Sequence, residues 1–370
     1  MTQNEKEERK GRLWAWLQDL TALDGVSGFE QDVVSFLKAA FAEYADEVRV
    51  DAMGNLYATR NGAGRAPHLM LAAHSDEIGA IVKSIDREGF LRLQPMGGVS
   101  AAMLVGRRVR VAGQLGVVGV KSGHLQSPEE RKSVLDFDGL YIDVGATSAE
   151  QVTQRGIAIG DPIVYYSPLI GLGPDRVSGK AIDNRIGCAI LLELFRSLAE
   201  VRPDGTVTAV VCAQEEVGLR GAQVAAYTLQ PDYAIVVDTF MAGDTPDVDY
   251  YREMPASIGQ GPVLLLVNSA HVGHPAVHRY LRRAAESAGV TLQSATVAQG
   301  MAATDAGAIH LSRRGVPSAG LGLARRYSHT PICTLDLKDA VGAVDVLYAF
   351  VHQMGDHADL GFLSAPAQGG

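Results

Sequence analysis

Short apolar segments that alternate with helix-like segments constrain the fold of this 370-residue chain more than any other feature. The apolar segments are PHLMLAA and residues 206–213, 233–238, 262–268 and 315–323. Nearly continuous apolar runs of this length are typical of strands buried on both faces of a sheet. The helix-like segments are residues 183–199, 218–229, 275–288, 304–313 and 336–353. The alternation predicts an α/β fold with a mixed, mostly parallel sheet flanked by helices.

The first 60 residues predict two helices and a hairpin. Leu13, Trp16, Leu17 and Leu20 recur at helical spacing, which indicates a helix with one apolar face. The Ser27-x-x-Glu30 sequence matches a capping box, so we expect it to open a second helix that runs to about residue 45. The segment VRVDAMGNLYATR alternates and contains a turn dipeptide, which predicts a β-hairpin.

A different pattern fills residues 78–168. Many short β-like segments follow one another there, such as IGAIVKSI, RRVRVAG and LGVVGVKS, with glycine turns between them and one brief helix expected to begin at Ser148. Regular short strands without long intervening helices favour a small β-barrel. We therefore predict an α/β domain in two parts, residues 1–77 and 169–370, interrupted by an inserted β-barrel-like domain at residues 78–168.

Charge and composition exclude several classes of function. The formal net charge is −9, whereas a general nucleic-acid binder or a protein that docks on anionic membranes needs a basic face. No run of eighteen apolar residues predicts a membrane span, and the polar start MTQNEKEERKGR has no apolar stretch typical of a secretion signal. Three dispersed cysteines fit a reducing compartment. We expect a cytoplasmic protein without nucleic-acid or membrane partners.

Five places in the chain carry side chains that bind metals, each at the end of a predicted strand or in the loop after one. They hold His74 and Asp76, Asp183, Glu215 and Glu216, Asp238, and His329. In open α/β sheets, ligands gather at the carboxyl ends of the strands. Each residue alone is better explained as a turn, a cap or a solvated loop. Together they form an ordered set, and mixed histidine and carboxylate ligands suit zinc, cobalt or manganese.

Two of these places carry additional information. Asp76 lies two residues after His74 and faces the same side of an extended chain, so its carboxylate can fix the tautomer of that histidine. Glu215 and Glu216 follow the apolar strand VTAVVCA, so at least one of the two acids must lie at the edge of the sheet. A carboxylate buried there without a cation would be costly.

Taken together, the motifs HSDEIG, GKAIDNRIGCA, AQEEVGLRGA, TDAGAIH and RYSHTP identify a resemblance. The chain resembles the tetrahedral (TET) and glutamyl aminopeptidase family of cocatalytic metallopeptidases over most of its length. The β-rich insertion directly after the first motif also matches, including LVGRRVRV and GLYIDVGA. The resemblance implies a zinc-exopeptidase type of sheet, removal of residues from the free amino end of peptides, and a homo-oligomer that is often a tetrahedral dodecamer.

The resemblance also implies a role for each candidate residue. Two divalent ions per subunit are expected, zinc first, with cobalt or manganese as alternatives. His74 and Asp238 would bind one ion, Glu216 and His329 the other, and Asp183 would bridge both. Glu215 would be the general base, and Asp76 would orient His74. The chain departs from the family pattern at Asn184, where another Asp is common, and in MAATDA, which lacks the glycines often found before Thr-Asp-Ala.

Other functions remain alternatives at this point. An N-acyl amino acid deacylase or a carboxypeptidase can use a similar metal site on the same fold. A non-catalytic scaffold that keeps the fold and assembles into a shell is a third hypothesis. The cluster HVGHPAVH resembles a second metal site, but Pro275 is expected to open a helix there and no acid lies beside the histidines. A serine hydrolase has no support, because the sequence has no Gly-x-Ser-x-Gly elbow.

Overall fold

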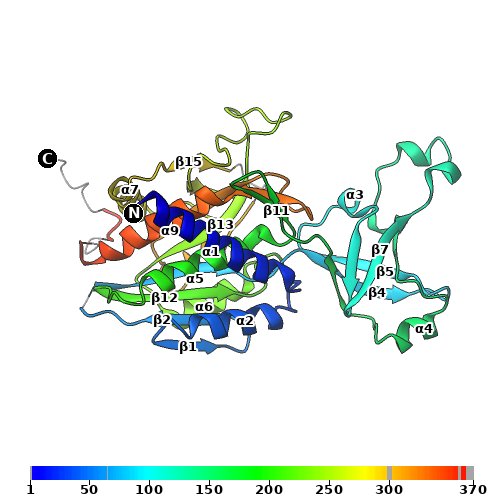
Figure 1. Cartoon of the computed structure of the whole chain (residues 1–370), viewed down its shortest axis with the longest axis horizontal. Coiled ribbons are helices and arrows are strands. Elements are labelled where there is room, and N and C mark those ends of the chain that lie inside the picture. The colour runs from blue at the N-terminus through cyan, green and yellow to red at the C-terminus, as the bar shows by residue number, and fades with distance from the viewer. Residues whose placement is uncertain (1, 65, 298–301, 357–359, 364–370) are drawn as a thin grey trace.

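An eight-stranded mixed sheet forms the centre of the α/β part of the chain. The computed structural model describes residues 2–64, 66–297, 302–356 and 360–363 (Figure 1). The order across the sheet is β1 (Glu47–Val50), β2 (Leu56–Arg60), β12 (Gly205–Cys212), β3 (Ala66–His74), β13 (Tyr233–Met241), β16 (Ser318–Arg325), β14 (Val263–Val267) and β15 (Gln293–Thr296). β1 and β2 form the predicted hairpin, with Glu47 opposite Thr59.

The four central strands of the sheet are parallel to one another. β12 pairs with β3, β3 with β13, and β13 with β16, each in parallel register. Antiparallel pairs join β2 to β12 and β14 to β16 at the flanks. The carboxyl ends of β12, β3, β13 and β16 therefore meet at one edge of the sheet, as the sequence predicted.

Helices cover both faces of the sheet because successive strand residues point to opposite sides. Leu69, Leu71 and Ala73 of β3 belong to a core that also contains residues of helices α1, α2, α5, α7 and α9. Met70 and Ala72 point the other way, into a smaller core with α6 and α8. The bounds are α1 (Gln3–Ala22), α2 (Gln31–Phe41), α5 (Ile182–Ser197), α6 (Arg220–Leu229), α7 (Pro275–Ala288), α8 (Ala306–Ile309) and α9 (Leu337–His352).

The β-rich stretch forms a closed barrel, which lies to one side of the α/β part in Figure 1. Its strands, in order around the barrel, are β4 (Gly79–Ile85), β5 (Leu91–Met96), β8 (Leu140–Asp143), β7 (Gln114–Val120), β6 (Arg108–Val111) and β9 (Pro162–Tyr165). Inward-facing residues such as Val82, Leu91 and Ile142 build its own core. The α/β sheet and the barrel are thus confirmed, while the domain boundaries at 78 and 168 stay predictions.

Smaller elements complete the chain. Helix α4 begins after Ser148, whose hydroxyl accepts a hydrogen bond from the Gln151 amide, as expected from the sequence. The remaining elements are α3 (Ala101–Leu104), the 3₁₀ turns η1 (Gly123–Leu125), η2 (Glu130–Lys132), η3 (Phe137–Gly139) and η4 (Met354–Asp356), and a three-stranded sheet of β10 (Ile170–Leu172), β11 (Arg176–Gly179) and β17 (Cys333–Asp336).

The predicted capping box at Ser27 and Glu30 is wrong. Helix α2 exists, but it begins at Gln31 without a side-chain cap and ends at Phe41, before the expected residue 45. The Ser27 hydroxyl instead donates to the Asp76 carboxylate at 2.6 Å, and the Glu30 carboxylate accepts from the Gln214 amide at 3.0 Å. Both side chains thus bond to loops distant in sequence.

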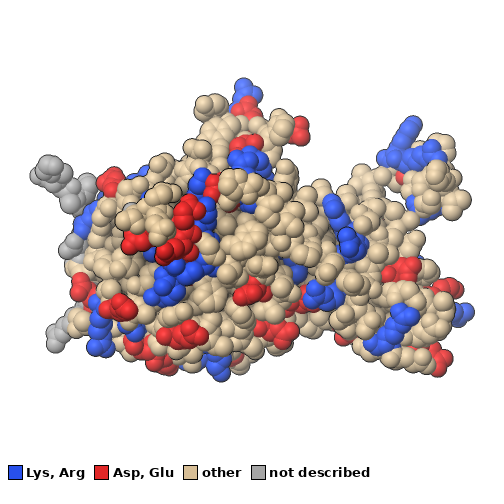
Figure 2. All heavy atoms as spheres, in the orientation of Figure 1, with Lys and Arg blue, Asp and Glu red and all other residues tan. Residues whose placement is uncertain are grey.

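Charges of both signs mix on the face of the molecule seen in Figure 2, with basic and acidic side chains side by side on the α/β part and on the barrel. None of the helices in the described residues combines the length and the apolar character that a membrane crossing needs.

A buried ionic network holds the segment that follows strand β3. Glu77 is 1% exposed, and Lys180 donates to its carboxylate at 2.8 Å. Arg185, which is fully buried, donates to the same carboxylate at 3.3 Å, to the Ser75 carbonyl at 2.6 Å and to the Leu20 carbonyl at 2.6 Å. One guanidinium therefore ties the end of α1, the loop after β3 and the start of α5 together.

Replacing the buried guanidinium should destabilise the protein strongly. In Arg185→Met, the Ser75 and Leu20 carbonyls lose a buried donor and the Glu77 carboxylate loses one of its buried cations, so we expect the free energy of unfolding to fall by about 3 kcal/mol or more. Urea unfolding measures this change. Lys121→Met is the control, because it removes an exposed pair with Glu130 and should cost less than about 1 kcal/mol. Equal losses in the two variants would contradict the role given to Arg185.

Candidate metal centre

The parallel core of the sheet brings the predicted site residues to one edge. His74 is the last residue of β3, and Asp238 lies in the carboxyl-terminal half of β13. Glu215 and Glu216 lie in the loop after β12, and His329 lies in the loop after β16. Asp183 comes from the first turn of α5, which packs against β3 and β13. All of these residues line one cavity of about 520 Å³.

The first group of ligand atoms surrounds His74. Its Nε2 lies 3.4 Å from Oδ1 of Asp183 and 3.7 Å from Oδ1 of Asp238. Oε2 of Glu215 is 4.0 Å from the same nitrogen. One nitrogen and two carboxylate oxygens thus converge from three different elements, close enough for one cation to contact them together.

The second group surrounds His329. Its Nε2 lies 3.5 Å from Oδ2 of Asp183 and 3.5 Å from Oε2 of Glu216. Its Nδ1 faces the Gly98 carbonyl oxygen at 3.2 Å, which fixes the ring when Nδ1 carries the proton and leaves Nε2 free to bind a metal. Asp183 therefore offers one oxygen to each group, as a bridging carboxylate must.

Asp76 organises the loops behind the first group. Its carboxylate accepts hydrogen bonds from the Ser27 hydroxyl at 2.6 Å and from the Glu215 and Glu216 amides at 2.9 and 3.1 Å. Nδ1 of His74 lies 3.1 Å from the Asp76 backbone carbonyl and 3.4 Å from its carboxylate. Burial alone would raise the pKa of Asp76, but the His74 ring and these donors hold it below its usual range. Asp76 thus contacts His74 as expected and also positions both glutamates.

The pKa shifts of the buried acids favour cations beside them. Burial, followed by the nearby Asp183 carboxylate, raises the pKa of Glu216 to about 7. Burial also raises the pKa of Glu215 well above its usual range, with Asp238 adding to the effect. The pKa of His74 is raised too, because the surrounding acids outweigh its burial. Divalent ions would stabilise the ionised form of these carboxylates, so the donor set fits a metal site.

Two site residues escaped the sequence analysis, Arg325 and Thr239. Arg325 is 4% exposed, forms an ion pair with Oδ2 of Asp183 and donates to the Thr239 hydroxyl and, at 2.7 Å, to the Ser328 hydroxyl. Thr239 in turn donates to Oδ1 of Asp183 at 2.9 Å. The one sequence signal was an arginine directly after the apolar run SAGLGLA, a position that usually points to solvent.

Asn184, the departure from the family pattern, is buried behind the site. Its amide nitrogen donates to the Val237 carbonyl at 2.9 Å, and its amide oxygen accepts from the Gly187 amide at 3.0 Å. A carboxylate cannot donate to the Val237 carbonyl. Asn184 therefore joins α5 to β13 next to Asp183 and Asp238.

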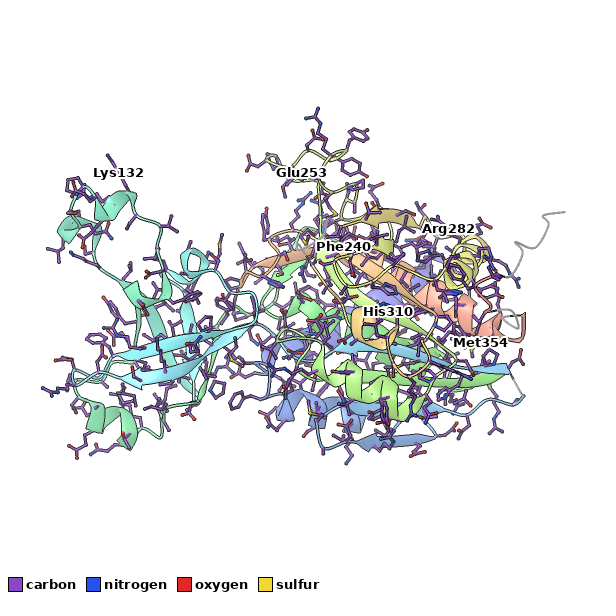
Figure 3. The ribbon with its side chains drawn as sticks, turned by 180° about the vertical axis from the view of Figure 1, so that it is seen from behind. Lys132, Phe240, Glu253, Arg282, His310 and Met354 are labelled. Carbon is purple, nitrogen blue, oxygen red and sulfur yellow. The ribbon has the colours of Figure 1, made fainter. Side chains whose placement is uncertain are left out.

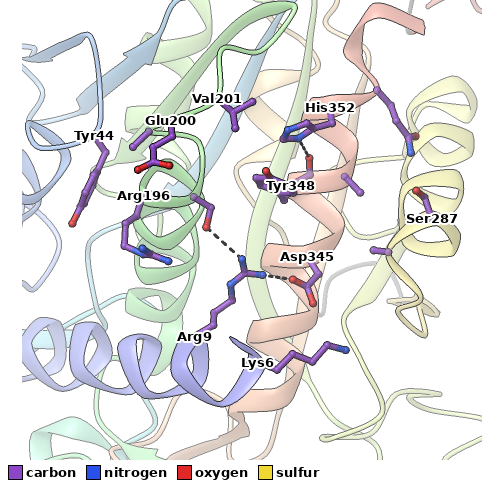
Figure 4. Close-up of a pocket in the computed structure, with 15 residues that line it drawn as sticks. Lys6, Arg9, Tyr44, Arg196, Glu200, Val201, Ser287, Asp345, Tyr348 and His352 are labelled. Atoms are coloured by element: carbon purple, nitrogen blue, oxygen red, sulfur yellow. Dashed lines mark hydrogen bonds and ion pairs between the residues drawn. The ribbon is translucent and has the colours of Figure 1, made fainter. Parts of the chain in front are cut away.

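A larger cavity of about 980 Å³ lies between α1, α5 and α9 (Figure 4). It is lined by the carboxyl end of α5, whereas Asp183 lies at the amino end of that helix, so it is remote from the metal centre. Its two arginines already have partners. Arg9 forms an ion pair with Asp345, and Arg196 donates to Glu193 at 3.0 Å. Among the described residues, no group able to hold a metal lines this cavity.

Comparisons with known proteins agree with the fold and the site. Residues 54–346 match the M42 glutamyl aminopeptidase family. A putative aminopeptidase from Acetivibrio thermocellus is 36% identical over 331 residues, covering 90% of this chain and 96% of that protein.

Two solved structures share the whole architecture. A TET aminopeptidase from a marine sediment thaumarchaeon superposes with a TM-score of 0.89 at 34% identity, covering 93% of this chain and 96% of that one. The TET1 peptidase of Pyrococcus horikoshii, which can assemble into a tetrahedron or a large octahedral shell, has a TM-score of 0.82 at 30% identity and covers 92% and 99%. The chain therefore belongs to the M42 glutamyl aminopeptidase family, and it is a metallo-aminopeptidase, a hydrolase that acts as an exopeptidase.

Proposed function

We propose that this chain removes amino-terminal residues from peptides at a cocatalytic centre of two divalent ions, zinc first among the candidates, with cobalt or manganese as alternatives. The observation that carries the proposal is the shared carboxylate of Asp183, whose two oxygens face His74 at 3.4 Å and His329 at 3.5 Å. His74 and Asp238 would hold one ion, and Glu216 and His329 the other. Such a pair of ions supplies an activated water and polarises the scissile carbonyl.

The protein's own contribution to the reaction is proton transfer and positioning. Glu215 lies beside both groups of ligands, 4.0 Å from His74, and its position after β12 places it within the cavity. We assign it as the general base that takes a proton from the attacking water and returns it to the leaving amine. Asp76 holds the Glu215 amide at 2.9 Å and contacts His74, so one buried carboxylate positions both the base and a ligand.

Acids that line the cavity also favour a substrate with a free amino group. A free amino group at the start of a peptide can donate hydrogen bonds to these carboxylates or bind an ion through its nitrogen, whereas a carboxyl terminus has no donor and an acylated amine has no basic nitrogen. This argument favours an aminopeptidase over the deacylase and carboxypeptidase alternatives. All of the proposed metal ligands and the proposed base are present, which argues against a non-catalytic scaffold.

Assembly and location belong to the same proposal. The Pyrococcus horikoshii TET1 peptidase assembles into closed shells, and this chain aligns with 99% of its length. We propose that this chain also self-associates, with a tetrahedral dodecamer as the candidate, and that it acts in the cytoplasm on peptides. Multi-angle light scattering gives the mass of the assembly, and a monomer at working concentration would contradict the proposal.

Hydrolysis should require both a free amino end and a divalent ion. We expect stepwise release of residues from free peptides and none from the same peptides after acetylation. Chelation should abolish the release, and one of zinc, cobalt or manganese should restore it. Mass spectrometry of the products follows each step. Hydrolysis confined to acetylated peptides would move the assignment to a deacylase, and hydrolysis that survives complete removal of metal would exclude the proposed chemistry.

Replacing the proposed base should separate catalysis from metal binding. In Glu215→Gln, kcat should fall by about 10²- to 10⁴-fold, because the amide cannot accept the proton, while the metal content stays near that of the unmodified protein. Elemental analysis and steady-state kinetics measure the two quantities. Glu286→Gln, an exposed change on α7, is the control and should alter neither. Turnover close to normal in Glu215→Gln would remove Glu215 from the mechanism.

A further inference from the structure

The proposed ligands make up only part of the lining of their cavity. Five apolar residues also line it and form what we call the apolar wall, namely Phe240, Met241, Leu265, Val297 and Ala302. These residues belong to a separate apolar cluster beneath the segment that joins β13 to β14. Figure 3 places Phe240 in the α/β part, at the base of the projecting segment that carries Glu253. A peptide bound at the proposed metals would have this apolar wall within the same cavity.

Packing on neighbouring glycines fixes two side chains of this wall. Phe240 and Leu265 come from β13 and β14, which lie on either side of β16. A Cβ atom on Gly322 of β16 would lie 2.5 Å from the Phe240 ring, and one on Gly320 would lie 3.1 Å from Leu265. The two glycines therefore leave the space that these apolar side chains fill. Since Phe240 is 3% and Leu265 4% exposed, the wall is a packed surface that exists before any substrate binds.

Among the described residues that line the cavity, the Asn268 amide and the Arg325 guanidinium already have hydrogen-bond partners. Asn268 donates to the Thr304 hydroxyl at 3.3 Å and accepts from the Ala270 amide at 3.0 Å. Arg325 is the one basic side chain, apart from the histidine ligands, among the described residues that line the cavity. Its guanidinium already contacts Asp183, Thr239 and Ser328, as set out above. The acids that line the cavity are the proposed ligands and the proposed base.

We propose that the cavity selects peptides whose first residue has a neutral, apolar side chain, such as leucine, methionine or phenylalanine. This inference rests on the proposed aminopeptidase function and adds the substrate class to it. Apolar side chains gain from burial against the wall. A lysine or glutamate side chain would lose its hydration there without gaining an ion pair, which disfavours binding.

A panel of peptides that differ only in the first residue tests the selectivity. With leucine, methionine, phenylalanine, glutamate and lysine in that position, we expect kcat/KM for the three apolar residues to exceed that for the two charged ones by about tenfold or more. A glutamate preference would overturn the inference and assign Arg325 as a reader of carboxylates. A lysine preference would overturn it as well. Failure to hydrolyse any free peptide would instead overturn the proposed function, and the inference with it.

Charge changes at Met241 provide the sharper test. Met241 is half-buried at the end of β13, and its Cα is paired with that of Arg325. Met241→Lys should raise the ratio of glutamate to leucine hydrolysis by about tenfold or more, and Met241→Glu should do the same for lysine. Because each ratio is taken within one variant, a general loss of activity cancels.

Val224→Lys is the matched control for these two variants. Val224 is exposed on α6 and does not line the cavity, so both ratios should keep their original values. Unchanged ratios in both Met241 variants would show that the wall does not meet the first side chain of the peptide, and this would overturn the inference.

Discussion

Repulsion among carboxylates at one buried edge of the sheet is the constraint around which this protein is arranged. The parallel strands that give the sheet its core also end at this edge, so the acids after β12 and within β13 cannot avoid one another. His74, His329 and the guanidinium of Arg325 lie among these acids and offset part of the negative charge. The proposed divalent ions would offset it with higher charge density and would keep the acids ionised, which is the state that general-base catalysis needs.

A second buried network, on the other side of the His74 loop, keeps that loop rigid. Arg185 ties the loop to α1 and α5, and Asp76 ties it to the two glutamates after β12. The proposed ligand His74 and the proposed base Glu215 are therefore held in place by Arg185 and Asp76. Side chains that are held in place before the reaction need little reorganisation during it, and such reorganisation would otherwise lower the rate of hydrolysis. This positioning also explains why a fully buried guanidinium, costly to desolvate, is retained near the site.

Whether a feature could be predicted from the sequence depended on how far apart along the chain its interacting residues lie. The sheet, the barrel, and the convergence of His74, Glu216 and Asp238 followed from apolar periodicity and from the rule that parallel strands end together. The capping box at Ser27 failed because the helix-start pattern is local, whereas the Ser27 hydroxyl is recruited by Asp76, which is 49 residues away in the chain. Arg325 was missed for the same reason, since only the folded arrangement shows that Asp183 lies opposite it. Local patterns predict elements, and long-range charge pairing decides which polar side chains are buried.

The same charge pairing also shapes substrate choice. The polar side chains near the proposed metal centre already form hydrogen bonds and ion pairs with one another. The surface that remains for a substrate side chain is therefore the apolar wall, and Gly320 and Gly322 leave the space that its side chains Leu265 and Phe240 fill. The proposed metal ligands and the apolar wall proposed to select the substrate are thus separate parts of the lining of one cavity. Substitutions at Met241 can alter the apolar wall without removing a proposed ligand. The barrel is coupled to the proposed ligands instead, because the Gly98 carbonyl, which comes from the segment after β5, orients His329. A shift of the barrel relative to the sheet would therefore act on metal binding before it acted on selectivity.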